Sequence, residues 1–149
     1  MAISNYYMAI IIGLTLSLLI EIKFGVSPGG LIVPSYLALV LDSPAILINI
    51  FLIAILTYVL LKYVVSKVVL IYGKRRFIAC VMIALLLKFV LGLLFPLIPF
   101  SVFSFSGIGV VASGILANTF FRQGIALTSG AALLTSALVY GVMNFVYLF

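Results

Sequence analysis

The stretch GVSPGGLIVPSYLALV, Gly25 to Val40, interrupts a chain that otherwise consists of long apolar segments. It places Pro28, Gly29, Gly30 and Pro34 inside an apolar run. Each proline lacks a backbone N–H and disturbs the helical hydrogen-bond ladder, whereas every backbone polar group in hydrocarbon needs a partner. Irregular backbone therefore persists in a membrane only where other helices bury it or where it lines a cavity. The four residues are accordingly candidates for a binding or transport site, and a tightly packed, kinked helix is the alternative.

The composition of the whole chain identifies a membrane protein. Of its 149 residues, 67% are hydrophobic and only 7% are charged, which is too few charges for the surface of a soluble globule. Four apolar segments are long enough to cross a hydrocarbon core roughly 30 Å thick. They run from about Tyr6 to Ile22, Ala45 to Tyr72, Phe77 to Phe95 and Ile125 to Phe149. We expect an all-α polytopic protein of the cell membrane, with residues 1–149 forming a single membrane domain.

A second glycine-rich apolar segment, FSGIGVVASGILANTFF, spans Phe105 to Phe121 and resembles the first. Gly30 aligns with Gly109, both segments continue with Leu-Ala, and both reach a polar turn that leads into a long helix. The candidate backbone positions of the second segment are Gly107, Gly109, Gly114 and Asn118. The repeated order of elements predicts an internal duplication with halves of approximately 1–72 and 77–149. Glycine is also common in packed membrane helices, where it permits close approach, so the likeness has a simpler alternative explanation.

Two topologies follow from this pattern. If each broken segment crosses the membrane, the halves are inverted repeats of three crossings each, and both termini lie outside. If the broken segments are re-entrant, the protein has four spans and both termini lie inside. The cluster Gly73 to Phe77 is placed in the cytoplasm by the positive-inside rule in either case. Only the six-crossing version also puts Lys23 and Arg122 on the cytoplasmic side, so charge placement favours inverted repeats.

The basic residues are the candidates for binding an anion or a partner. They are Lys23, Lys74, Arg75, Arg76, Lys88 and Arg122. Lys88 stands apart, because it lies about 16 Å along its helix from Phe77, near the middle of the hydrocarbon core. A cation at that depth needs protein, water or a counter-charge around it. Lys62 and Lys67, near the end of the second long segment, are interpreted as interfacial anchors.

The residue inventory excludes most catalytic chemistry within one chain. Histidine is absent, and the acids are limited to Glu21 and Asp42. With Cys80 as the only cysteine, neither a serine triad nor a Cys/His pair nor a zinc site can be assembled. No phosphate-binding GxxxxGK[ST] loop occurs either. We expect no catalytic residues, no metal, no cofactor and no nucleic-acid partner, and the chain alone is not expected to be an enzyme.

The chain resembles the poly-γ-glutamate biosynthesis family PgsC/CapC over essentially its whole length. The specific parts are YGKRRF and GIGVVASGILANT followed by RQG, together with the terminal YLF. In the family pattern Val-Pro-Gly stands where this chain has Ala112, Ser113 and Gly114, which leaves the sharpness of the second kink open.

The resemblance implies a membrane subunit of a complex that makes and exports poly-γ-glutamate. The implied partners are a cytosolic ATP-dependent amide ligase, a mostly extracellular membrane-anchored subunit and the anionic polymer itself. Apart from the resemblance, an apolar chain of this kind is expected to contact membrane lipid, and a chain of 149 residues is expected to need further copies of itself to enclose a polymer-sized route. A small transporter or channel that acts without a ligase is one alternative. A structural scaffold for the ligase is another.

Overall fold

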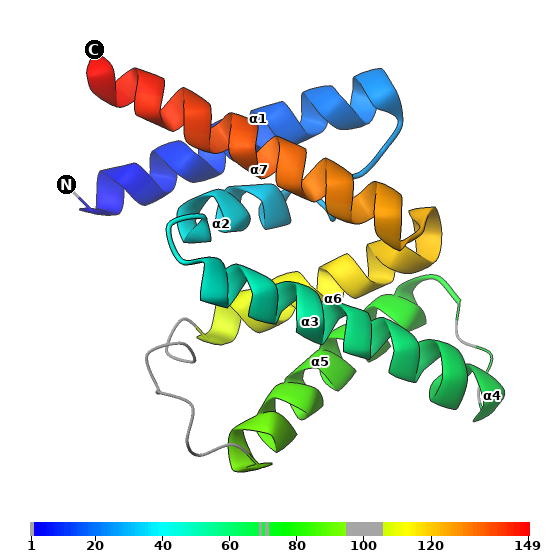
Figure 1. Cartoon of the computed structure of the whole chain (residues 1–149). Helices are drawn as coiled ribbons and strands as arrows, with labels where there is room; N and C mark the ends of the chain where they lie inside the picture. The colour runs from blue at the N-terminus through cyan, green and yellow to red at the C-terminus, as the bar shows by residue number, and fades with distance from the viewer. Residues whose placement is uncertain (1, 69, 71, 95–105) are drawn as a thin grey trace.

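The computed structural model describes residues 2–68, 70, 72–94 and 106–149, and its regular elements are all helical (Figure 1). They are α1 (Ala2–Phe24), α2 (Ile32–Val40), α3 (Pro44–Leu60), the π-helix η1 (Leu61–Val65), α4 (Ser66–Val68), α5 (Lys74–Leu94), α6 (Ser106–Gln123) and α7 (Ile125–Leu148). No strand occurs in the described ranges, which confirms the prediction of an all-α protein.

Four helical stretches are long and apolar enough to cross a membrane. They are Tyr6–Phe24, Pro44–Val68, Lys74–Leu94 and Ile125–Leu148, with lengths of 19, 25, 21 and 24 residues. These lengths suit a hydrocarbon core that about 20 helical residues can span. The four long apolar helices expected from the sequence are therefore present, and the second of them ends four residues earlier than expected, at Val68.

The first broken segment is interrupted as expected, but the break lies entirely before α2. Gly25, Gly29 and Gly30 have φ values of 66°, 93° and 89°, a left-handed region that glycine enters without steric cost. Pro34 does not break the helix, contrary to expectation, because it is the third residue of α2. An N–H in the first helical turn has no partner within the helix, so a proline there removes nothing.

The expectation of a break in the second segment is wrong for the residues that the structure describes. Ser106 to Gln123 form one continuous helix of 18 residues, α6. No proline falls between these positions, and the glycines within α6 keep negative φ. The first positive φ in this region is at Gly124, just after the helix. Phe105, where the predicted segment begins, lies outside the described residues.

The chain passes back and forth along a single direction (Figure 1). α1, α3 and α6 run away from the end of the bundle that holds both termini, whereas α2, α5 and α7 run toward it. α2 packs against α1 and α7 on one side of the bundle, and α6 packs against α3 and α5 on the other. α2 and α6 also contact each other, so the two segments singled out in the sequence meet inside the bundle.

The largest buried cluster lies around this contact. α2 contributes Val33 and Leu37, and α6 contributes Leu116 and Phe120, with further members from α3 and α7. All four side chains are at most 1% exposed, whereas many large apolar side chains among the described residues are exposed. Exposed apolar residues are expected on a surface that faces lipid. The buried core of the protein lies around α2 and α6.

Candidate functional site: the basic end of the bundle

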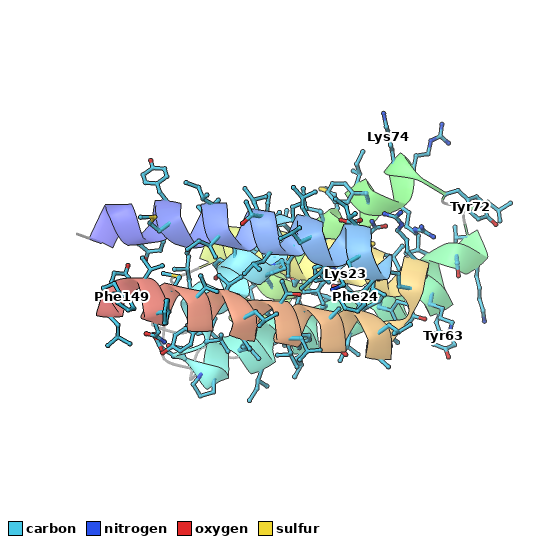
Figure 2. All side chains as sticks on the ribbon, turned by 90° about the horizontal axis from the view of Figure 1, so that it is seen from above. Lys23, Phe24, Tyr63, Tyr72, Lys74 and Phe149 are labelled. Carbon is cyan, nitrogen blue, oxygen red and sulfur yellow. The ribbon has the colours of Figure 1, made fainter. Side chains whose placement is uncertain are left out.

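Every lysine and arginine except Lys88 belongs to one end of the bundle, which we call the basic end. Lys23 is in the last turn of α1 and Lys74 begins α5, and Figure 2 shows both away from Phe149 at the opposite end. Arg122 lies at the same end, in the last turn of α6. Its neighbour Gln123 joins α6 to the segment after α1, since Gln123 Oε1 accepts a hydrogen bond of 3.1 Å from the backbone N–H of Ser27. The structure thus brings together the terminal cations of three helices that are far apart in sequence.

Arg76 is the best-anchored cation of the basic end. Its Nε donates a hydrogen bond to Asn118 Oδ1 at 3.3 Å, which joins the start of α5 to α6. Its guanidinium lies 5.4 Å from the centre of the Phe121 ring, a distance typical of a cation–π contact. The sequence pointed to Arg76 and Asn118 separately, and the structure joins them in one contact.

Aromatic rings extend this contact to α3. The Tyr58 ring centre lies 4.6 Å from that of Phe121, and Lys62 Nζ donates to the Tyr58 hydroxyl at 3.4 Å. We call Tyr58, Lys62, Arg76, Asn118 and Phe121 the cation–aromatic cluster. Sequence reasoning missed Tyr58 and Phe121, since their meeting depends on how α3 packs on α6. The sequence could have predicted only the contact of Tyr58 with Lys62, because residues four apart lie on the same face of a helix.

The charge of the basic end is not neutralised by the chain itself. Glu21 and Asp42 are the only acids, and neither forms an ion pair with a lysine or arginine in the part of the chain that the structure describes. Lys74 and Arg75 are exposed. An end of this kind can bind a polyanion or an acidic protein surface, because unpaired exposed cations attract opposite charge at long range.

Lys88 lies apart from the basic end. It is 14 residues after Lys74 in α5, roughly 21 Å along the helix axis. Lys88 is half-buried and shares a helix face with Ala84, one turn earlier. Ala84 is fully buried in a small cluster with Ile53 of α3 and Val110 of α6. The side of α5 that carries Lys88 therefore faces the interior of the bundle near α6.

The irregular backbone between Gly25 and Leu31 is held by the protein's own side chains. Ser17 Oγ of α1 donates to the carbonyl oxygen of Gly30 at 3.3 Å, and the N–H of Gly30 donates to Ser27 Oγ at 3.2 Å. Pro28 is fully buried, and a Cβ placed on Gly29 would lie 3.4 Å from Leu116 of α6. The structure thus places Pro28, Gly29 and Gly30 in a packed and hydrogen-bonded turn.

Glycines of the second segment serve close approach between helices. A Cβ on Gly109 would lie 2.9 Å from the hydroxyl of Tyr36 in α2. A Cβ on Gly114 would lie 2.9 Å from the Val81 Cα in α5. Gly107 is in the first turn of the same helix. The contacts of Gly109 and Gly114 give both glycines a packing role in a continuous α6.

Comparisons with known proteins agree on one family. The family model described as Capsule biosynthesis CapC matches residues 12–129. The capsule biosynthesis protein CapC of Bacillus anthracis is 42% identical over 146 residues, which cover 98% of both chains. The PGA biosynthesis protein CapC of Bacillus subtilis (strain 168) is 40% identical over 145 residues, which cover 97% of both chains. No solved structure matches the chain.

Proposed function

The chain belongs to the capsule biosynthesis CapC family, and from this premise we propose that it is the membrane subunit of a poly-γ-glutamate synthase and export complex. A cytosolic ATP-dependent amide ligase makes the bonds of the polymer in this proposal. The chain receives the product at its basic end and supports its passage across the membrane. A mostly extracellular, membrane-anchored subunit completes the complex.

The observation that carries the proposal is the separation of charge along the bundle. Poly-γ-glutamate bears about one negative charge per residue at neutral pH, so a surface that receives it needs cations that are not already paired. The net charge of the chain is +6, and all the basic residues except Lys88 belong to one end. The absence of histidine and the single cysteine support a role in binding or passage, with bond formation left to the partner ligase.

The same charges support an orientation. Cytoplasmic loops of membrane proteins carry an excess of lysine and arginine, so the basic end is assigned to the cytoplasm and both termini to the outside. Four spans with two re-entrant segments would put Lys23 and Lys74 on opposite sides of the membrane. Their position at one end of the bundle (Figure 2) supports six crossings instead.

The packing of the helices supports inverted repeats. If α1 is exchanged with α5, α2 with α6 and α3 with α7, the pairs of helices in contact stay the same. The pair α1 and α2 becomes α5 and α6, the pair α2 and α7 becomes α6 and α3, and the pair α1 and α7 becomes α5 and α3. α1 and α5 run in opposite directions (Figure 1), which supports two halves that are inverted with respect to each other.

One matched pair of contacts supports the same relation at the level of residues. The alignment of Gly30 with Gly109 also aligns Ser35 with Gly114. In the first half, a Cβ on Gly13 of α1 would lie 2.8 Å from the Ser35 Cα. In the second half, a Cβ on Gly114 would lie 2.9 Å from the Val81 Cα of α5. In each half, a glycine therefore permits close approach at the same aligned position. The glycine belongs to α1 in the first half and to α6 in the second.

Co-expression tests the proposed function. The chain is produced in a host that makes no poly-γ-glutamate, with and without a candidate cytosolic ligase. γ-Linked polymer outside the cells and co-purification of the ligase are measured. We expect polymer and bound ligase only when both proteins are present. Absence of both would contradict the proposal, and export of small solutes without the ligase would indicate an independent transporter.

A charge reversal at the basic end locates the contact. Arg75 is exposed, and Arg75→Glu is expected to lower both ligase co-purification and polymer yield, because it places a negative charge where an anion is received. Ser43→Glu adds the same charge to an exposed position of the α2–α3 turn and serves as the matched control. Equal loss in both variants would argue against docking at the basic end.

A further inference from the structure

A cavity opens at the end of the bundle opposite the basic residues. It has a volume of about 340 Å³ and lies between the start of α1, the end of α2 and the last turns of α7. Its polar lining comes from Tyr6, Asp42, Tyr140, Asn144 and Tyr147. None of these residues is among the cations that receive the polymer in the proposed function. They belong to the start of α1, the turn after α2 and the last turns of α7, at the end of the bundle that holds both termini (Figure 1).

The carboxylate in this cavity is held in place but is not neutralised. The Tyr140 hydroxyl donates to Asp42 Oδ1 at 2.9 Å, across 98 residues of sequence. Within the ranges that the structure describes, no lysine or arginine pairs with Asp42, and Oδ2 remains able to accept further hydrogen bonds. A fixed negative charge beside three tyrosine rings attracts a cation, both by charge and by the negative faces of the rings.

The surroundings of the cavity indicate which cation reaches it. Tyrosine side chains gather at the membrane surface, at the level of the lipid headgroups. The last turns of α7 are exposed and apolar, with Phe145 63% exposed and Leu148 81% exposed, as expected for a surface covered by lipid. Ala38 and Leu39 of α2 add apolar atoms to the wall. The cavity therefore offers polar groups to a lipid headgroup and apolar groups to the adjoining acyl chains.

We propose that this cavity binds a phospholipid through the primary ammonium group of an ethanolamine headgroup. The ammonium donates hydrogen bonds to Asp42 Oδ2 and lies against the tyrosine rings. The Asn144 amide and the hydroxyls of Tyr6 and Tyr147 supply donors for the phosphate, since the Tyr140 proton is already donated to Asp42. Recognition of the ammonium group uses Asp42 and the tyrosines alone and is independent of the cations that receive the polymer.

Lipid retention by the purified full-length protein tests the site. The protein in detergent micelles is mixed with equal amounts of phosphatidylethanolamine and phosphatidylcholine of the same acyl composition, which differ in the hydrogen-bond donors of the headgroup and not in net charge, and bound lipid is counted by native mass spectrometry. We expect phosphatidylethanolamine to predominate. Since a hydrogen bond to a charged group changes affinity roughly tenfold, Asp42→Asn should reduce the preference by about that factor. Tyr140→Phe should reduce it less, because the carboxylate remains.

Glu21→Gln is the matched control. Glu21 is the other acid of the chain and lies in α1, outside the cavity, so this variant should retain the wild-type preference. Size-exclusion profiles identify variants that fail to fold. If Asp42→Asn fails to fold, Tyr140→Phe still tests the site. A wild-type preference that is absent, or that Asp42→Asn leaves unchanged, would overturn the proposal. Free ethanolamine should displace the lipid poorly; complete displacement at equal concentration would assign the site to soluble amines instead.

Discussion

Replacement of Gly114 by alanine tests the closest helix contact of the second half. The added Cβ would lie 2.9 Å from the Val81 Cα and 3.1 Å from Val81 Cγ2. The first of these atoms is backbone, so α5 and α6 must move apart to accept the methyl group. Overpacking of this kind costs about 1–3 kcal/mol. Alanine also gains up to about 1 kcal/mol over glycine in a helix, which would partly hide the loss.

Gly130→Ala removes that complication. Gly130 is also inside a long helix, α7, and a Cβ there would meet no atom within 4 Å. Its substitution carries the same gain in helix propensity without the overpacking. The difference in unfolding free energy between the two variants is therefore expected to be about 1–3 kcal/mol, with Gly114→Ala the less stable. Titration of the protein with denaturing detergent, followed by circular dichroism, measures it. Equal stability of the two variants would refute the packing of α6 on α5.

Three further outcomes follow from the structure. Arg76→Gln removes a hydrogen bond and a cation–π contact and should lower the unfolding free energy by about 1–3 kcal/mol in the same titration, whereas the exposed Arg75→Gln should change it by less than about 0.5 kcal/mol. Lys88→Met should reduce extracellular polymer while the protein remains inserted, as membrane fractionation would verify, because it removes a cation that lies along α5 beyond the basic end, where a passing polyanion would meet it; normal yield would show that passage does not need Lys88. Gly29→Ala forces alanine to a φ of 93° and should destabilise by about 1–3 kcal/mol, and a wild-type unfolding midpoint would show that the turn is not packed as described.

The sequence predicted the features that depend on length and local chemistry. The four long helices follow from apolar length alone, because few other structures satisfy the backbone in hydrocarbon. The interruption at Gly25 to Leu31 follows from Pro28 and from glycines that take positive φ. The family resemblance was confirmed by relatives at 42% and 40% identity.

The errors arose where a glycine has two possible uses. Gly109 and Gly114 suggested a broken backbone, but they admit Tyr36 and Val81 against a continuous helix. Pro34 suggested a break for a similar reason, although a proline in the first helical turn is tolerated. Which use applies depends on the neighbouring helix, and that information is absent from the local sequence.

Features that join distant segments could not be predicted at all. The pair of Asp42 and Tyr140 spans 98 residues and has no signature in either segment. The contact of Tyr58 with Phe121 depends in the same way on how α3 crosses α6. The sequence therefore supplied the cations of the basic end, whereas the structure supplied the aromatic and amide groups that hold one of them.

The proposed function depends most on a basic end that faces the cytoplasm after six crossings. The direct measurement is labelling of single cysteines in intact cells by a membrane-impermeant thiol reagent, in a background where Cys80, which is buried, is replaced by alanine. We predict that Ser43→Cys is labelled in intact cells and that Lys23→Cys and Lys74→Cys are labelled only after permeabilisation. Labelling of Lys23→Cys in intact cells, with Lys74→Cys protected, would contradict the six-crossing arrangement and favour four spans.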